Sequence, residues 1–212
     1  ILAIWVGIVL VIASRVETKR DEKLNITTSF YPMYVATLNI TDGVEDVEVT
    51  NLTKGTTSCL HEYSLTTEEM VSLVDSDALV INGAGMEGFL SNVISNYSNL
   101  EIIDSSKGIE LMEMECRHNH EHKGEAEEHN SHIFVSISNY IKQIENITEG
   151  LVKIDNNNAE KYLNNSREYI KELEELKKEI ENTIKFLSNK NIVTFHESFD
   201  YFAKEFGLNV VT

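Results

Sequence analysis

The stretch from Ala159 to Leu187 is the feature that most constrains how this chain can fold. Its apolar residues recur at steps of three and four, which puts them on one face of a single long helix. They are Tyr162, Leu163, Tyr169, Ile170, Leu173, Leu176, Ile180, Ile184 and Leu187. Such a helix spans roughly 40 Å, longer than a small domain needs. It therefore indicates either a coiled coil or a rigid connector between two lobes.

Before this helix, strand-like and helix-like patterns alternate along the chain. The predicted strands are 24–28, 44–52, 78–81 and 100–103, and the predicted helices are 30–40, 66–74, 87–97 and 135–154. Pro32 is tolerated in the first turn of the first helix, and Thr66 with Glu69 forms the pattern of a capping box. Strands and helices in this order indicate βαβ units and a parallel sheet.

A second unit of the same kind starts after the long helix, with a strand at 191–195, a helix at 198–206 and a further strand from Leu208. We therefore predict an α/β fold with two lobes of parallel sheet flanked by helices, joined by one long rigid helix, and an incomplete second lobe. The predicted divisions are an N-terminal segment 1–23, an N-terminal lobe 24–154 with a His-rich loop 116–131, a linking helix 155–188, and the start of a C-terminal lobe 189–212.

Charge and cysteine content limit the possible partners. The chain of 212 residues has 18 Lys and Arg against 35 Asp and Glu, giving a net charge of −17. This balance excludes nucleic acid and suits a protein that attracts cations. The two cysteines, Cys59 and Cys116, lack CxxC spacing, so neither a thiolate zinc cluster nor a disulfide framework is indicated. Whether they pair stays open.

The first residues indicate export. Ile1 to Ala13 is an uncharged apolar run, too short for a membrane span but typical of the hydrophobic region of a signal peptide. A bacterial lipoprotein signal would continue with a cysteine, but Ser14 and Arg15 follow instead. We expect a location in the periplasm or at the cell surface, with an uncleaved N-terminal membrane anchor as the alternative.

Histidines are concentrated between Cys116 and Phe134, where five of the seven occur. Such a density predicts binding of a divalent metal. The histidines at 118, 120, 122 and 129 lie among polar residues, so we expect His118, His120, His122 and His129 to be auxiliary ligands on a solvated loop. His132 precedes the apolar Ile133, Phe134 and Val135, and is the better candidate for a site on rigid structure.

Two further histidines lie near the ends of predicted strands, where ligands bind in parallel sheets. His61 is in the loop after strand 44–52, and His196 follows the apolar strand 191–195. Taken singly, each also fits an ordinary surface or partly buried histidine. Glu62 is a weaker candidate, since a residue adjacent to His61 on an extended loop usually points elsewhere.

Several segments together resemble the metal-binding proteins that serve bacterial ABC importers of zinc and manganese. They are Ser29 to Pro32, Cys59 to Tyr63, Asn82 to Glu87, the His-rich loop, His132 to Phe134, and Thr194 to Phe202. They follow the family's order and cover nearly the whole chain from Leu24. The His-rich loop resembles that of the zinc-type members. Ser131 and Phe134 stand where the family usually has Pro and Trp.

The resemblance implies a metal held between two α/β lobes and a membrane permease as partner. It puts His61, His132 and His196 at the positions of the three ligand histidines, with the fourth ligand, a carboxylate, expected beyond Thr212, or a water. Three imidazoles at about 2.0–2.1 Å suit Zn²⁺ better than Mn²⁺, which prefers oxygen ligands.

The predicted function is thus an exported, high-affinity zinc-binding protein that delivers Zn²⁺ to an ABC importer, and not an enzyme. Three alternatives stay open. The first is a manganese carrier of the same family. The second is a zinc-dependent hydrolase, since three histidines and an open position also describe catalytic zinc, although no HExxH motif is present. The third is a surface adhesin that dimerises through the long helix.

Overall fold

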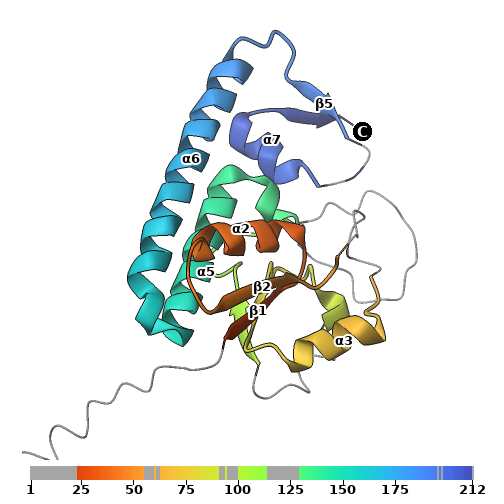
Figure 1. Ribbon diagram of the computed structural model, residues 1–212. Helices are drawn as coiled ribbons and strands as arrows, with labels where there is room; N and C mark the ends of the chain where they lie inside the picture. Colours follow the sequence, from red (N-terminus) through yellow and green to blue (C-terminus); the bar gives the residue numbers. More distant parts are fainter. Residues whose placement is uncertain are drawn as a thin grey trace, which may run out of the picture.

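The computed structural model describes residues 23–54, 60, 63–90, 94, 100–113, 129–194, 196 and 198–211. A parallel sheet with strand order β2-β1-β3-β4 is at the centre (Figure 1). Its strands are β1 (Leu24–Thr28), β2 (Val47–Asn51), β3 (Ala78–Ile81) and β4 (Glu101–Asp104). In the register, Ile26 of β1 lies opposite Val49 on one side and Ala78 on the other.

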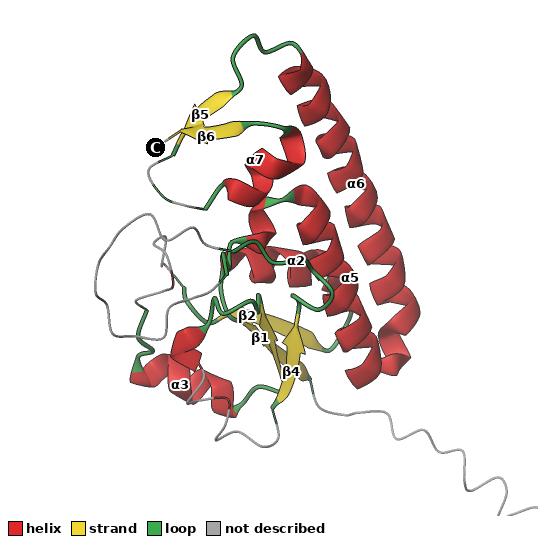
Figure 2. Cartoon of the chain, turned by 180° about the vertical axis from the view of Figure 1, so that it is seen from behind, coloured by secondary structure: helices red, strands yellow, loops and turns green. Residues whose placement is uncertain are grey.

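Helices cover both faces of this sheet (Figure 2). On one face, α2 (Tyr31–Thr41) and α5 (Ile137–Ile154) bury the larger core, and α3 (Thr67–Val74) packs on the other. Because successive side chains of a strand point to opposite faces, Ala78 and Val80 of β3 enter the first core and Leu79 the second. This arrangement confirms the predicted α/β fold with a parallel sheet.

The local signals in the sequence have the structural effects expected of them. Pro32 lies in the first turn of α2. The capping box before α3 is formed: the Thr66 hydroxyl accepts a hydrogen bond from the Glu69 amide, and the Glu69 carboxylate accepts one from the Thr66 amide. Of the helix predicted at 87–97, the structure describes a 3-10 turn at Gly88–Leu90, and most of the remainder lies outside the described residues.

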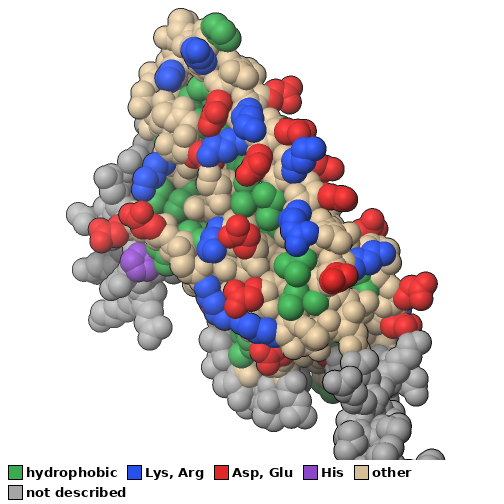
Figure 3. Space-filling view, turned by 90° about the vertical axis from the view of Figure 1, so that its left-hand side faces the viewer, with side chains coloured by type: hydrophobic (Ala, Val, Ile, Leu, Met, Phe, Trp, Pro, Cys, Tyr) green, Lys and Arg blue, Asp and Glu red, His purple; other side chains and the backbone are tan. Residues whose placement is uncertain are grey.

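The long helix is α6 (Ala159–Lys185), which packs along α5 and α2. Its apolar stripe is less buried than the pattern predicts: Tyr162 and Ile184 are buried, whereas Leu163, Leu176 and Leu187 are 39%, 45% and 47% exposed. Figure 3, which faces the α6 side of the molecule, shows acidic and basic side chains interspersed along it. The inner stripe is thus used within the chain, as a connector requires.

A smaller unit follows α6 and packs near its C-terminal end (Figure 1). It contains β5 (Asn191–Val193), α7 (Asp200–Phe206) and β6 (Asn209–Val211), with β5 and β6 parallel. Phe206 of α7 is buried together with Ile137 of α5 and Ile184 of α6. The unit therefore has a core shared with the two long helices. Within the described residues, no helix is both long and apolar enough to span a membrane.

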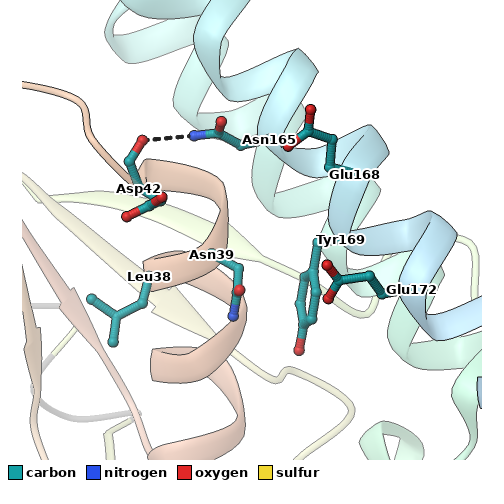
Figure 4. A pocket seen from close by; sticks show the side chains of 7 residues that line it. All are labelled: Leu38, Asn39, Asp42, Asn165, Glu168, Tyr169 and Glu172. Atoms are coloured by element: carbon teal, nitrogen blue, oxygen red, sulfur yellow. Dashed lines mark hydrogen bonds between the residues drawn. The ribbon is translucent and has the colours of Figure 1, made fainter.

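A shallow groove of about 480 Å³ separates α2 from α6 (Figure 4). Its lining combines polar, acidic and apolar side chains: Leu38, Asn39, Asp42, Asn165, Glu168, Tyr169 and Glu172. One of these crosses between the helices, since Nδ2 of Asn165 donates to the backbone carbonyl of Asp42 at 2.9 Å. The Asn165 side chain of α6 thus crosses the groove at the C-terminal end of α2.

Candidate metal site

The carboxyl ends of the parallel strands carry a buried polar network. After β3 the chain turns through Gly83, Ala84 and Gly85, all with positive φ. Left-handed backbone suits glycine, and at Gly83 space also requires it, because a β-carbon there would lie 2.1 Å from a carboxylate oxygen of Asp104. This turn brings the carboxylate of Glu87 back beneath the strand ends.

Glu87 holds the ends of two strands together. Its carboxylate accepts hydrogen bonds from the Ser29 hydroxyl (2.7 Å), the Asn82 amide (2.7 Å) and the Gly83 amide (3.1 Å). Burial raises the pKa of Glu87 to about 7, against the three hydrogen bonds, which lower it. The segment Asn82 to Glu87, which the sequence analysis identified, therefore stabilises the carboxyl ends of β1 and β3.

Asn82 connects this edge to the residue before His132. Its side-chain Nδ2 donates to the Ser131 carbonyl at 3.0 Å. The buried Gln143 of α5 donates from Nε2 to Asn82 Oδ1 at 3.0 Å and to the Ser105 hydroxyl at 2.8 Å. These bonds fix the backbone at 131 relative to β3, β4 and α5.

His132 is held on rigid structure, as its apolar neighbours predicted. It is 7% exposed and directly precedes a 3-10 helix, Ile133–Val135. Ile133 is fully buried, and the ring of Phe134 packs edge-on against Phe30 with a centroid distance of 5.2 Å. The backbone amide and Nδ1 of His132 lie 2.9 and 3.0 Å from Oδ1 of Asn130.

His196 comes from the other unit and meets His132 at its remaining ring nitrogen. The two Nε2 atoms are 3.2 Å apart, with ring planes at 85°. His196 is exposed, whereas His132 is buried. The pair therefore lies at the surface, where the segment that leads into α7 meets the buried segment of His132. Of the three histidines named from the resemblance, the structure brings these two together.

Of the other candidate ligands, the structure describes only His129. His61, Glu62, His118, His120 and His122 lie outside the described residues. His129 is described: it is exposed and forms an isolated antiparallel bridge with Glu113. Within the part of the chain that the structure describes, no three His, Cys, Asp or Glu side chains cluster as a metal site would. The complete ligand set thus stays a prediction.

Reasoning from the sequence missed three residues beside the histidine pair. Nδ2 of Asn130 donates to the Asp200 carboxylate at 3.0 Å, and the Tyr201 hydroxyl donates to the Asn130 carbonyl at 2.8 Å. Tyr201 is 4% exposed, as a core residue would be, but its hydroxyl also contacts this region. The only sequence signal was proximity: Asn130 is two residues before His132, and Asp200 four after His196.

Comparisons with known proteins identify the family. A family model described as the periplasmic component A of a zinc-uptake complex matches residues 26–212. The high-affinity zinc uptake system protein ZnuA of Bacillus subtilis is 33% identical over 208 residues, covering 91% of this chain and 61% of that protein. The zinc-binding lipoprotein AdcA of Streptococcus pneumoniae is 28% identical, covering 92% and 40%. The chain thus spans less than two thirds of these curated relatives.

Solved structures share the fold. A crystal structure of ZnuA superposes with a TM-score of 0.77 at 28% identity, covering 90% of this chain and 71% of that one. The Zn(II)-bound ZnuA-like domain of Streptococcus pneumoniae AdcA gives a TM-score of 0.76 at 25% identity, covering 89% and 66%. Given the family match over almost all of its length, the chain belongs to the family of periplasmic zinc-uptake component A proteins.

Proposed function

We propose that the chain is the zinc-capturing part of an extracytoplasmic protein that binds Zn²⁺ and delivers it to the membrane permease of an ABC importer. The observation that carries this proposal is the 3.2 Å separation between Nε2 of His132 and Nε2 of His196. Two nitrogens at about 2.0–2.1 Å from a tetrahedral zinc ion lie about 3.3–3.4 Å from each other. The observed spacing therefore suits two ligands of one zinc ion.

His61 is the proposed third ligand. The described residues that flank it in the sequence, Leu60 and Tyr63, are themselves held on the core. Leu60 is buried in the main core, and the Tyr63 amide donates to the Leu60 carbonyl at 3.0 Å. The Tyr63 ring packs edge-on against Phe89 at 5.2 Å. A zinc ion bound by His61, His132 and His196 would link the N-terminal lobe to the unit after α6. Zinc binding would then change the relative position of these two parts.

The auxiliary ligands belong to the same proposal at a lower affinity. We place His118, His120, His122 and His129 in a collecting role, because a loop of closely spaced imidazoles binds zinc weakly and releases it readily. Glu62 is the proposed oxygen donor nearest to His61. The net charge of −17 would raise the local concentration of cations around all of these groups.

The relatives support the proposed partner and location. One of them is named as a zinc uptake system protein and another as a zinc-binding lipoprotein, and both descriptions suit a protein that works outside the cytoplasmic membrane. The apolar run from Ile1 to Ala13 is the proposed export signal or anchor. A binding role, rather than a hydrolytic one, agrees with the family, whose members serve zinc uptake.

A competitive titration against a chromogenic zinc chelator tests the proposal on the full chain. We expect one tight site in the parent, lost in His61→Ala, His132→Ala and His196→Ala. His129→Ala is the matched control and should keep it. Tight binding that survives all three substitutions would refute the proposed site. Repeating the titration with Mn²⁺ tests selectivity, since three imidazoles favour zinc.

The collecting role of the loop histidines is tested by a separate titration. A triple variant, His118→Ala with His120→Ala and His122→Ala, should lose only weak additional zinc while the tight site remains. If total zinc stoichiometry is unchanged in this variant, the loop histidines bind no cargo.

A further inference from the structure

Asn130 faces two parts of the molecule with the two ends of its amide. Oδ1 lies 2.9 Å from the backbone nitrogen and 3.0 Å from Nδ1 of His132, and Nδ2 lies 3.0 Å from Oδ2 of Asp200. A backbone N–H can only donate and a carboxylate accepts, so the amide oxygen must face His132 and the amide nitrogen must face Asp200. The orientation of the Asn130 side chain is therefore fixed from both ends.

This orientation selects the tautomer of His132. Since Oδ1 of Asn130 accepts, Nδ1 of His132 must carry the proton to complete the bond at 3.0 Å. Nε2 is then left with its lone pair, and it is this atom that lies 3.2 Å from Nε2 of His196. A neutral imidazole binds a metal through its unprotonated nitrogen, and the bond made by the other nitrogen sets which one that is.

Asn130 is itself held by the segment that carries His196. It is 3% exposed, its backbone N–H donates to the Met112 carbonyl, and its carbonyl accepts from the Tyr201 hydroxyl. The same hydroxyl accepts from the Met112 amide at 2.8 Å. Because Asp200 and Tyr201 begin α7, one asparagine is bonded both to His132 and to the helix that follows His196.

We propose that Asn130 is a positioning residue of the cargo site: it holds His132 in the tautomer whose Nε2 is unprotonated, as metal binding requires, and it anchors that histidine to the start of α7. This inference rests on the proposed function and deepens it. It predicts that metal affinity depends on a side chain that does not touch the metal, and that the dependence runs through the hydrogen-bond acceptor at position 130.

Three variants separate the two contacts. Asn130→Ala removes both. Asn130→Asp keeps an acceptor for His132 but sets its carboxylate against that of Asp200. The double variant, Asn130→Asp with Asp200→Asn, keeps the acceptor for His132 and restores the contact between positions 130 and 200 with donor and acceptor exchanged. All three are made in the full chain, and thermal melts report whether each one folds.

The first readout needs no metal. Long-range ¹H–¹⁵N correlation spectra of the metal-free protein, recorded at a pH where His132 is neutral, report which ring nitrogen carries the proton. We expect the Nδ1–H tautomer in the parent, in Asn130→Asp and in the double variant. In Asn130→Ala the population should move towards Nε2–H. An unchanged tautomer in a folded Asn130→Ala variant overturns the inference.

The second readout is zinc affinity by chelator competition. We expect Asn130→Ala to bind about 10- to 100-fold more weakly, the usual cost of losing the hydrogen-bond partner of a ligand histidine. The double variant should bind within about threefold of the parent, on the same reasoning. If Asn130→Ala fails to melt cooperatively, the decision passes to Asn130→Asp, which should melt lower and bind zinc more weakly than the double variant. Equal values for those two overturn the proposal.

The outcomes distinguish this inference from the proposed function. If His132→Ala and His196→Ala leave tight zinc binding intact, the cargo site itself is wrong. If those two variants abolish binding while Asn130→Ala keeps both the tautomer and the affinity, only the role of Asn130 is wrong.

Discussion

Glu205, on α7, accepts two hydrogen bonds from Ser138 at the start of α5, from its hydroxyl at 2.6 Å and its backbone amide at 3.1 Å. The same carboxylate accepts from the Ser136 hydroxyl and pairs with Nζ of Lys177 on α6 at 2.9 Å. A carboxylate at the N-terminus of a helix is favoured by the free amides and the helix dipole there. One side chain thus holds α7 against both long helices.

Replacing Glu205 with Gln should destabilise the folded chain by about 2 kcal/mol, since hydrogen bonds to a charged group contribute more than neutral ones. Urea unfolding at pH 7 measures the difference. The exposed Glu181 on α6 supplies a matched control, and Glu181→Gln should change stability by less than about 0.5 kcal/mol. Equal effects of the two substitutions would contradict the role given to Glu205.

The contribution of Glu205 to folding stability should also depend on pH. Burial raises the pKa of Glu205, but hydrogen bonds from Ser138, Lys177 and Ser136 outweigh burial and hold it below the usual value of 4.5. A lowered pKa in the folded state means that the stabilisation is complete above pH 4.5 and is lost as pH falls through the folded pKa. The difference between parent and Glu205→Gln should therefore shrink below pH 4.5.

Gly150, within α5, allows this helix to lie directly against the sheet. A β-carbon at position 150 would lie 2.7 Å from the side chain of Ile103 on β4. Gly150→Ala should therefore destabilise the chain by about 1–3 kcal/mol through overpacking, outweighing the roughly 1 kcal/mol that alanine gains over glycine in a helix. Chemical denaturation measures the net sign.

Two companion variants test the steric origin of that effect. Ile103→Ala removes the side chain that would clash, so adding Gly150→Ala to it should cost less than adding it to the parent. Gly88 has open space around its position, and Gly88→Ala should be nearly neutral. A stabilising Gly150→Ala would show that the helix shifts freely and that close packing is not needed.

The strands and helices were predictable because their signals are local. Alternation in 24–28 and the short apolar run in 78–81 predicted β1 and β3 with the observed bounds, and the Thr66–Glu69 box predicted the start of α3. The stripe at 159–187 gave the length of α6 to within two residues. Its exposed leucines were not predictable, because burial depends on which helices lie opposite.

The candidate site was only partly predictable. Apolar residues after His132 indicated a rigid position, and that histidine is held on the core. Its approach to His196 followed only from the family resemblance, since no periodicity relates residues 64 positions apart. Asn130 and Asp200 gave no signal beyond their proximity to the two histidines, because short polar side chains in a loop or at the start of a helix usually contact water, and their pairing requires the packing of α7. The domain boundaries and the full ligand set stay predictions.

The Glu87 carboxylate predicts a loss of stability towards alkaline pH. Burial raises its pKa in the folded state to about 7, from 4.5. A raised folded pKa means that this contribution is fully present below pH 4.5 and is lost as pH rises through about 7. The size of the loss is on the order of 3 kcal/mol, at about 1.4 kcal/mol per pKa unit.

Denaturation of the parent and of Glu87→Gln at pH 5 and pH 8 isolates the pH-dependent contribution of Glu87 to stability. The variant has no group to titrate at position 87, so its stability should change less between the two pH values than that of the parent. Glu110→Gln, at an exposed position, should keep the pH dependence of the parent. Parallel profiles for the parent and Glu87→Gln would rule out Glu87 as the titrating group.

Asn165 on α6 completes the end of α2. Its Nδ2 donates to the carbonyls of Ile40 and Asp42, both at 2.9 Å, where the last carbonyls of a helix lack partners within the helix. Figure 4 shows the bond to Asp42. Asn165→Ala should cost about 1–2 kcal/mol in urea unfolding and speed hydrogen exchange in the last turn of α2. Asn164→Ala, one residue earlier and exposed, should leave that exchange unchanged. If both variants unfold and exchange alike, α6 stabilises α2 through apolar packing alone.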